Sequence, residues 1–105
     1  MKAKPYKFNN STYVPCETKE ATHIRLSIPG PIPDRILPII THGKREGTNY
    51  WSWNGDTENP TIRPSILSED GTNKCHCWIT DGKVIFLNDS NHEFAGKTMD
   101  LLEVE

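Results

Sequence analysis

The sequence predicts a mainly β protein: a single small antiparallel barrel or sandwich with little helix and a central hairpin at residues 75–88. Several short runs alternate apolar with polar residues, the typical pattern of half-buried strands. Pairs of asparagine or aspartate with glycine, which favour tight hairpin turns, follow some of these runs. No window of twelve residues has the apolar stripe of an amphipathic helix.

The chain divides into an N-terminal segment and one β-rich domain. Residues 1–20 are polar and lack a sustained period, so we expect an N-terminal arm or an edge strand there. Residues 21–105 form the single domain, because a chain of 105 residues supports one modest core. Within it, residues 24–28 alternate as a half-buried strand, and the run 35–41, broken by Pro38, suits an edge strand.

The second half of the domain carries the strongest turn signals. A polar loop over 42–49 precedes the alternating run 50–53. The apolar run 61–68 contains Pro64, which predicts an edge strand or a bulge. The remaining elements are the central hairpin, a loop or single helical turn over 91–97, and a closing strand over 98–104.

The central hairpin brings a histidine and an aspartate onto one face. Asp81-Gly82 suits the positive φ angles of a two-residue turn, and such a turn sets His76 opposite Leu87 with Asp89 further along the same face. His76 and Asp89 are then diagonal neighbours, roughly 7 Å apart at Cβ. A carboxylate that accepts from one imidazole nitrogen leaves the other basic, as in a hydrolytic triad. A structural histidine and a turn aspartate remain the alternative interpretation.

Ser65 is the candidate nucleophile of such a site. Pro64 restricts the backbone beside it, and a well-positioned hydroxyl favours attack. His92 lies three residues after Asp89 and could serve as a second base, as a substrate hydrogen-bond donor or as a cap for the next turn. The rivals of Ser65 on residue type are Ser52, Ser68 and Ser90.

Zinc binding is the main alternative to a catalytic site without a cofactor. Cys75, His76, Cys77 and His92 are all suitable zinc ligands. Three consecutive residues of a strand cannot face one ion, so smaller sets are Cys75, Cys77 and His92, or His76, Asp89 and His92. The same alternation places both cysteines on the face opposite His76, which argues against a Cys–His catalytic pair.

Aromatic and polar residues before Ser65 could form a substrate pocket or simply fill the core. Arg63 could pair with Asp56 or with a substrate carboxylate, although a surface ion pair is the commoner role. The candidate substrate-binding residues are Trp51, Trp53, Asn54, Gly55, Asp56 and Arg63.

Charge and composition exclude several classes of partner. The formal net charge is −2 and the longest basic cluster is Lys44-Arg45, so we expect no nucleic-acid partner. No apolar stretch is long enough to span a bilayer, so we expect no membrane partner. The odd number of cysteines fits a reducing compartment, which favours a cytoplasmic protein.

Two blocks of the sequence resemble a known family. The block Trp51-Ser-Trp-Asn-Gly…Pro-Thr-Ile-Arg-Pro-Ser-Ile-Leu and a second block from Cys75-His76 to Asp100-Leu101 are similar to a small family common in phages and prophages. That family is often mislabelled as a putative ammonia monooxygenase, and it is similar to the BubE component of bacterial ubiquitin-like conjugation operons. The resemblance covers about half the chain, over residues 50–101.

The resemblance implies a serine-peptidase-like enzyme that acts on ubiquitin-like proteins or their conjugates. It implies Ser65 as nucleophile, His76 as base, and Asp89 or His92 as the orienting partner. Many members have cysteine where this chain has Ser90. A zinc site that used that cysteine would lose a thiolate here, so the family pattern favours the serine interpretation.

The leading hypothesis is a small serine-hydrolase-like domain, related to phage or defence, that acts on the tail or conjugate of a ubiquitin-like protein. His92 or backbone N–H groups near Asn54-Gly55 would stabilise the oxyanion. The alternative is a non-catalytic binding module, with or without a structural zinc ion, that binds a host or phage protein. A third hypothesis is a purely structural domain held by a metal.

Overall fold

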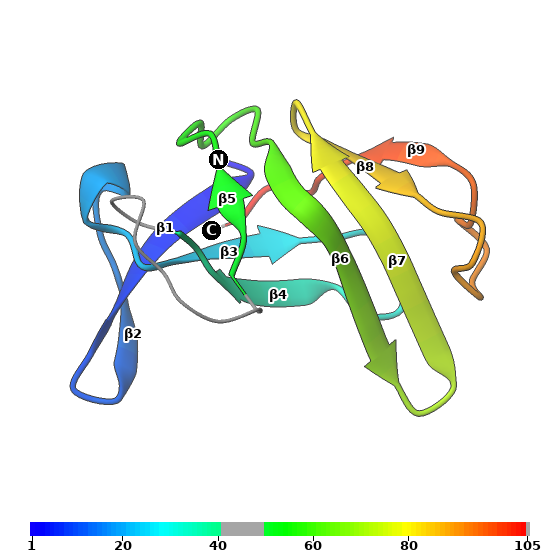
Figure 1. Cartoon of the computed structure of the whole chain (residues 1–105), viewed down its shortest axis with the longest axis horizontal. Coiled ribbons are helices and arrows are strands. Elements are labelled where there is room, and N and C mark those ends of the chain that lie inside the picture. The colour runs from blue at the N-terminus through cyan, green and yellow to red at the C-terminus, as the bar shows by residue number, and fades with distance from the viewer. Residues whose placement is uncertain (41–49, 105) are drawn as a thin grey trace.

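The computed structural model describes residues 1–40 and 50–104, which form two antiparallel sheets and one short 3-10 turn (Figure 1). One sheet has the strand order β2-β1-β3-β4 and the other the order β5-β6-β7-β8-β9. The described part does not close into a barrel, so the predicted mainly β class is confirmed in its sandwich-like form. The elements are β1 (Ala3–Asn9), β2 (Thr12–Pro15), η1 (Thr18–Glu20), β3 (His23–Ser27), β4 (Asp34–Pro38), β5 (Ser52–Trp53), β6 (Ile62–Asp70), β7 (Asn73–Thr80), β8 (Lys83–Phe86) and β9 (Thr98–Asp100).

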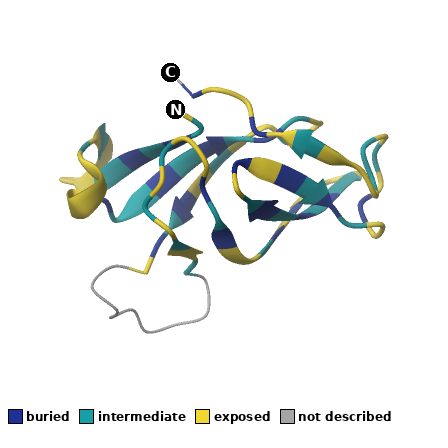
Figure 2. Cartoon of the chain, turned by 90° about the horizontal axis from the view of Figure 1, so that it is seen from above, coloured by how far each residue is buried: buried dark blue, intermediate teal, exposed yellow. Residues whose placement is uncertain are grey.

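The core lies between the two sheets, as the buried bands along their strands show (Figure 2). Every second side chain of a strand faces inward, so β3 contributes Ile24 and Leu26 while β7 contributes Cys75, Cys77 and Ile79. Two isolated bridges join the sheets, one from Ile39 to Trp51 and one from Ser27 to Leu102. None of the helical structure in the described ranges has the length and apolar character needed to cross a membrane.

The N-terminal residues form a hairpin of the first sheet. Strand β1 pairs with both β2 and β3, while β2 lies at the edge. Ala3 is fully buried, and the carbonyl of Met1 accepts a 2.8 Å hydrogen bond from the N–H of Val104. The two ends of the chain therefore lie side by side (Figures 1 and 2).

Strand β6 combines a bulge with an incompletely covered edge. Its register on β7 shifts between Ile62, opposite Ile79, and Ile66, opposite Cys77. The bulge expected around Pro64 is therefore confirmed. Strand β5 covers only the start of β6, at Ile62 and Arg63, so the alternative expectation of an edge strand is met only from Pro64 onward. The run with Pro38 forms β4, which lies at the edge of the first sheet, as expected. The loop expected over 42–49 falls outside the described residues.

The central hairpin has the predicted register. Thr80 pairs with Lys83, and Trp78 pairs with Ile85. Asp81 and Gly82 have φ angles of 50° and 75°, as a tight turn with two positive φ angles requires. The pairing extends beyond β8, because the N–H of Leu87 donates to the carbonyl of His76 over 2.8 Å.

Candidate active site

His76 points to the outer face of β7, away from the core. Its neighbours Cys75 and Cys77 are buried in the core, so alternation along the strand turns the imidazole to the other side of the sheet. The His76 side chain is 24% exposed, and solvent therefore reaches it.

Ser65 lies beside His76 on this outer face. The Ser65 hydroxyl oxygen is 2.9 Å from Nε2 of His76. Leu67 is the residue of β6 directly opposite His76, so Ser65 occupies the diagonal position on the same face, where the bulge ends. The indole N–H of Trp51 donates to the backbone carbonyl of Ser65 over 3.3 Å and fixes this segment from the other side.

Asp89 completes a continuous polar chain. Its carboxylate oxygens lie 2.9 and 3.1 Å from Nδ1 of His76. A carboxylate can only accept, so Nδ1 carries a proton and Nε2 of the neutral ring accepts from the Ser65 hydroxyl. The hydrogen bond from His76 lowers the pKa of Asp89 below its usual value, and the positive charge of Lys74 lowers it further. Asp89 thus holds the imidazole in the tautomer that a general base needs.

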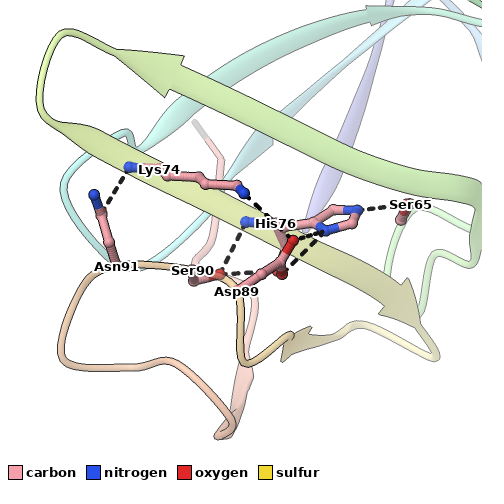
Figure 3. A network of polar contacts seen from close by, with 6 residues as sticks. All are labelled: Ser65, Lys74, His76, Asp89, Ser90 and Asn91. Carbon is pink, nitrogen blue, oxygen red and sulfur yellow. Dashed lines mark hydrogen bonds and ion pairs between the residues drawn. The ribbon is translucent and has the colours of Figure 1, made fainter.

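The loop that carries Asp89 is tied to β7 by its next two residues (Figure 3). The Ser90 hydroxyl accepts from the N–H of His76 over 2.9 Å and donates to the His76 carbonyl over 3.1 Å. The Asn91 side chain accepts from the N–H of Lys74 over 2.7 Å. Ser90 and Asn91 hold the Asp89 loop in place, a role that sequence reasoning missed because it depends on where the loop runs.

A family model described as "Bacterial ubiquitination-like system serine protease (BubE)" matches residues 11–87 of the 105-residue chain. The chain belongs to the BubE family. The matched range confirms the resemblance noted from the sequence and extends it to residues before Tyr50; it contains Ser65 and His76 and ends just before Asp89. No curated protein and no solved structure matches the chain.

The inner face of β7 carries a second, buried group of reactive side chains. Cys77 donates a hydrogen bond that lowers the pKa of Cys75, and the side chain of His92 lowers it further. The same contact and burial raise the pKa of Cys77. His92 packs edge-on against Phe86, with ring centroids 5.1 Å apart, so the structure places it away from Ser65 and His76.

The two faces of β7 keep the proposed zinc ligands apart. His76 points outward, whereas Cys75 and Cys77 point into the core beside His92. In the described part of the chain, no three or more His, Cys, Asp or Glu side chains are grouped so that they could hold a metal ion. The zinc set of Cys75, His76, Cys77 and His92 is therefore not brought together in this BubE-family chain.

Of the substrate-binding residues expected from the sequence, Trp51 contacts the Ser65 segment directly. Trp53 instead donates to the carbonyl of Asp56, within its own turn. The Asn54 carboxamide oxygen accepts from the N–H groups of Asp56 and Thr61, so this turn closes on itself. The backbone N–H groups of Asn54 and Asp56 bond to the Thr61 carbonyl and to the Asn54 side chain, so the turn uses them itself.

Arg63 shares the outer face with Ser65 but contacts the sheet itself. Its guanidinium donates to the carbonyl of Ile79 over 2.9 Å and to the hydroxyl of Thr80 over 3.0 Å. It also lies over the ring of Trp78, 5.0 Å from the centroid. These contacts, and not the expected pair with Asp56, hold Arg63 at the bulge.

Proposed function

We propose that this BubE-family protein is a serine hydrolase in which Ser65 is the nucleophile, His76 the general base and Asp89 the orienting carboxylate. One observation carries this proposal: the unbroken chain of contacts from the Ser65 hydroxyl through both nitrogens of His76 to Asp89, each 2.9 Å at its shortest. Strand β6 carries Ser65 and β7 carries His76, while Asp89 lies on the loop that Ser90 ties to the backbone of His76.

The geometry supports acyl transfer in two steps. The Ser65 oxygen attacks the substrate carbonyl as its proton passes to Nε2 of His76, which gives a tetrahedral intermediate. The intermediate expels the amine, alcohol or thiol leaving group, which takes the proton from His76, and an acyl-Ser65 ester remains. A water then attacks the ester as its proton passes to His76, and the second tetrahedral intermediate releases the acyl group as a carboxylic acid while the Ser65 oxygen takes the proton back from His76. Asp89 stabilises the imidazolium in both steps.

Oxyanion stabilisation is assigned to the β6 bulge, in place of His92 and of the turn at Asn54-Gly55. A bulge leaves backbone groups of its extra residues without a ladder partner. Here the extra residues lie between Ile62 and Ile66 and include Ser65 itself. Pro64 has no N–H, so the donor assigned here is the N–H of Ser65 itself, next to the attacking oxygen, as stabilisation of a developing oxyanion requires.

The substrate of this proposal is a protein, specifically the tail or a conjugate of a ubiquitin-like protein. The family description names a ubiquitination-like system, which supports this class of substrate. The site itself fits a flexible tail, because the catalytic residues lie on an open sheet face where Asp89 is 48% exposed. The reacting carbonyl would be an ester, a thioester or an isopeptide-like amide.

A fluorophosphonate probe tests the catalytic assignment, because it modifies only an activated serine. We expect the wild type to be labelled at Ser65 and the Ser65→Ala variant to be unlabelled. Ser52→Ala is the matched control, since Ser52 is an exposed serine on the neighbouring strand β5 and its variant should label like the wild type. Absence of labelling in the wild type, or equal labelling of Ser65→Ala, would contradict the proposal and favour a non-catalytic binding module.

A further inference from the structure

Strand β6 has an open backbone edge directly after Ser65. Strand β5 pairs with β6 only at Ile62 and Arg63, although β6 continues to Asp70. From Pro64 onward, no strand among the described residues pairs with the side of β6 that faces away from β7. An exposed strand edge of this kind is a template for an added strand.

The backbone groups of Leu67 point toward this open edge. In an antiparallel pair, two directly opposite residues either exchange both backbone hydrogen bonds or exchange neither. His76, opposite Leu67, uses its N–H on Ser90 and its carbonyl on Leu87, both on the far side from β6. Leu67 therefore makes no ladder bond with His76, and its N–H and carbonyl face away from β7. The carbonyl of Ser65, two residues earlier, also faces that way, toward Trp51.

A largely apolar groove lies along this edge, between β4 and β6. Its volume is about 280 Å³, and its walls include Ile36 from β4 and Leu67 from β6, which are 43% and 52% exposed. Trp51 also lines the groove and at the same time contacts the carbonyl of Ser65. The groove is thus continuous with the proposed catalytic centre.

Arg35 gives the groove a positive charge that no carboxylate among the described residues pairs with. It lines the groove, and its Nε is buried without a hydrogen-bond partner among those residues. No ion pair joins its guanidinium to a carboxylate in the described ranges. A buried donor without a partner is costly, so an acidic group that enters the groove would be stabilised there.

We propose that this groove binds an extended segment of the protein substrate as an added strand on β6, paired with the N–H and carbonyl of Leu67. An apolar side chain of the segment packs between Ile36 and Leu67, and an acidic side chain pairs with Arg35. This proposal rests on the proposed function, because it names how the substrate reaches Ser65.

The orientation of the segment follows from the sheet. Strands β5 and β7 both run antiparallel to β6. A substrate strand added on the side of β5 would also run antiparallel to β6. Such a strand runs from the Ser68 end of the groove toward Ser65. The substrate residues before the scissile carbonyl therefore lie along Leu67. The part of the substrate after the scissile bond turns into solvent where β5 begins.

Fluorescence anisotropy with a labelled peptide tests the groove. The probe is fluorescein-Gly-Val-Glu-Val-Leu-Gly-Gly, and the protein is the full chain with Ser65→Ala, which cannot cleave it. Leu67→Pro removes the edge N–H without removing a ladder bond to β7, while Leu67→Ala shortens the side chain and keeps the N–H. We expect saturable binding, and about tenfold weaker binding with Leu67→Pro than with Leu67→Ala.

The peptide itself supplies two further controls. Methylation of the backbone nitrogens should weaken binding about tenfold without any change to the protein. Replacement of the glutamate by glutamine should weaken binding about tenfold to the chain with Arg35, but not to the Arg35→Gln variant. Absence of saturable binding, or equal binding of the peptide and its methylated form, would overturn the groove proposal.

Labelling separates this proposal from the catalytic one. The small fluorophosphonate needs the triad but not the groove, so labelling of the wild type at Ser65 tests the catalytic assignment independently of peptide binding. Peptide binding without labelling of the wild type would refute the catalytic assignment alone. Labelling without peptide binding would refute the groove alone.

Discussion

The outer and inner faces of β7 carry two sets of reactive side chains that differ in their access to solvent. On the outer face, His76 lies between Ser65 and Asp89, and its side chain is 24% exposed. On the inner face, Cys75 and Cys77 are packed in the core beside His92, and Cys77 is fully buried.

The difference shows that the nucleophilicity of a side chain and its accessibility to a substrate are separate properties. A thiol with a lowered pKa, such as Cys75, is intrinsically a better nucleophile than a neutral hydroxyl. A substrate carbonyl cannot reach Cys75, however, because the side chains of the core surround it. Alternation along one strand therefore separates polar side chains that are exposed to solvent from a buried polar cluster that packs the core.

The largest expected effect concerns the carboxylate on the outer face. Asp89→Asn should lower the rate of fluorophosphonate labelling about 10⁴-fold, because the amide can hold His76 in the wrong tautomer.

The lowered pKa of Asp89 keeps its carboxylate charged down to a pH below the usual range of aspartate. The stabilisation linked to Asp89 is thus present at neutral pH and is lost only as the pH falls through that lowered pKa.

The matched control for Asp89→Asn is Cys75→Ala, which changes the inner face alone. It should leave the labelling rate near that of the wild type, measured on folded protein by mass spectrometry over time. If Cys75→Ala abolished labelling while the protein remained folded, the assignment of the two faces would be wrong.

A smaller but still large effect is expected for thiol alkylation. Cys16 is partly exposed, whereas Cys75 and Cys77 are buried. Iodoacetamide should therefore modify Cys16 on the order of 10² times faster than Cys75, although burial raises the pKa of Cys16 and its neighbours lower that of Cys75. Peptide mapping after timed alkylation measures this ratio, and in denaturant the difference should disappear. Fast modification of Cys75 in the folded protein would show that the inner face is accessible.

The contrast between the two faces was predictable from sequence because it depends on local rules. Asp81-Gly82 fixes a tight turn, the turn fixes the register, and the register places His76 and Asp89 on one face and the cysteines on the other. Alternating apolar runs likewise predict strands without any knowledge of their neighbours in the sheet.

The remaining parts of the site depend on contacts between distant segments. Spacing alone does not show that β6 lies beside β7, so the place of Ser65 next to His76 followed only from the family resemblance. We expected N–H groups near Asn54-Gly55 to stabilise the oxyanion, but the Asn54 side chain closes its own turn, which spacing in the sequence does not reveal. His92, close to Asp89 in sequence, turns into the core against Phe86.

The smallest expected effect concerns Ser90, which joins the Asp89 loop to the backbone of His76. Ser90→Ala leaves the N–H of His76 without its partner and loosens the loop, so labelling should slow about tenfold. Ser68→Ala is the matched control, because Ser68 is also a buried serine but faces Cys75 on β7 instead of His76. The two variants should lose similar thermal stability, while only Ser90→Ala should slow labelling. Equal labelling of both would mean that Ser90 serves the fold alone and that the Asp89 loop keeps its position without it.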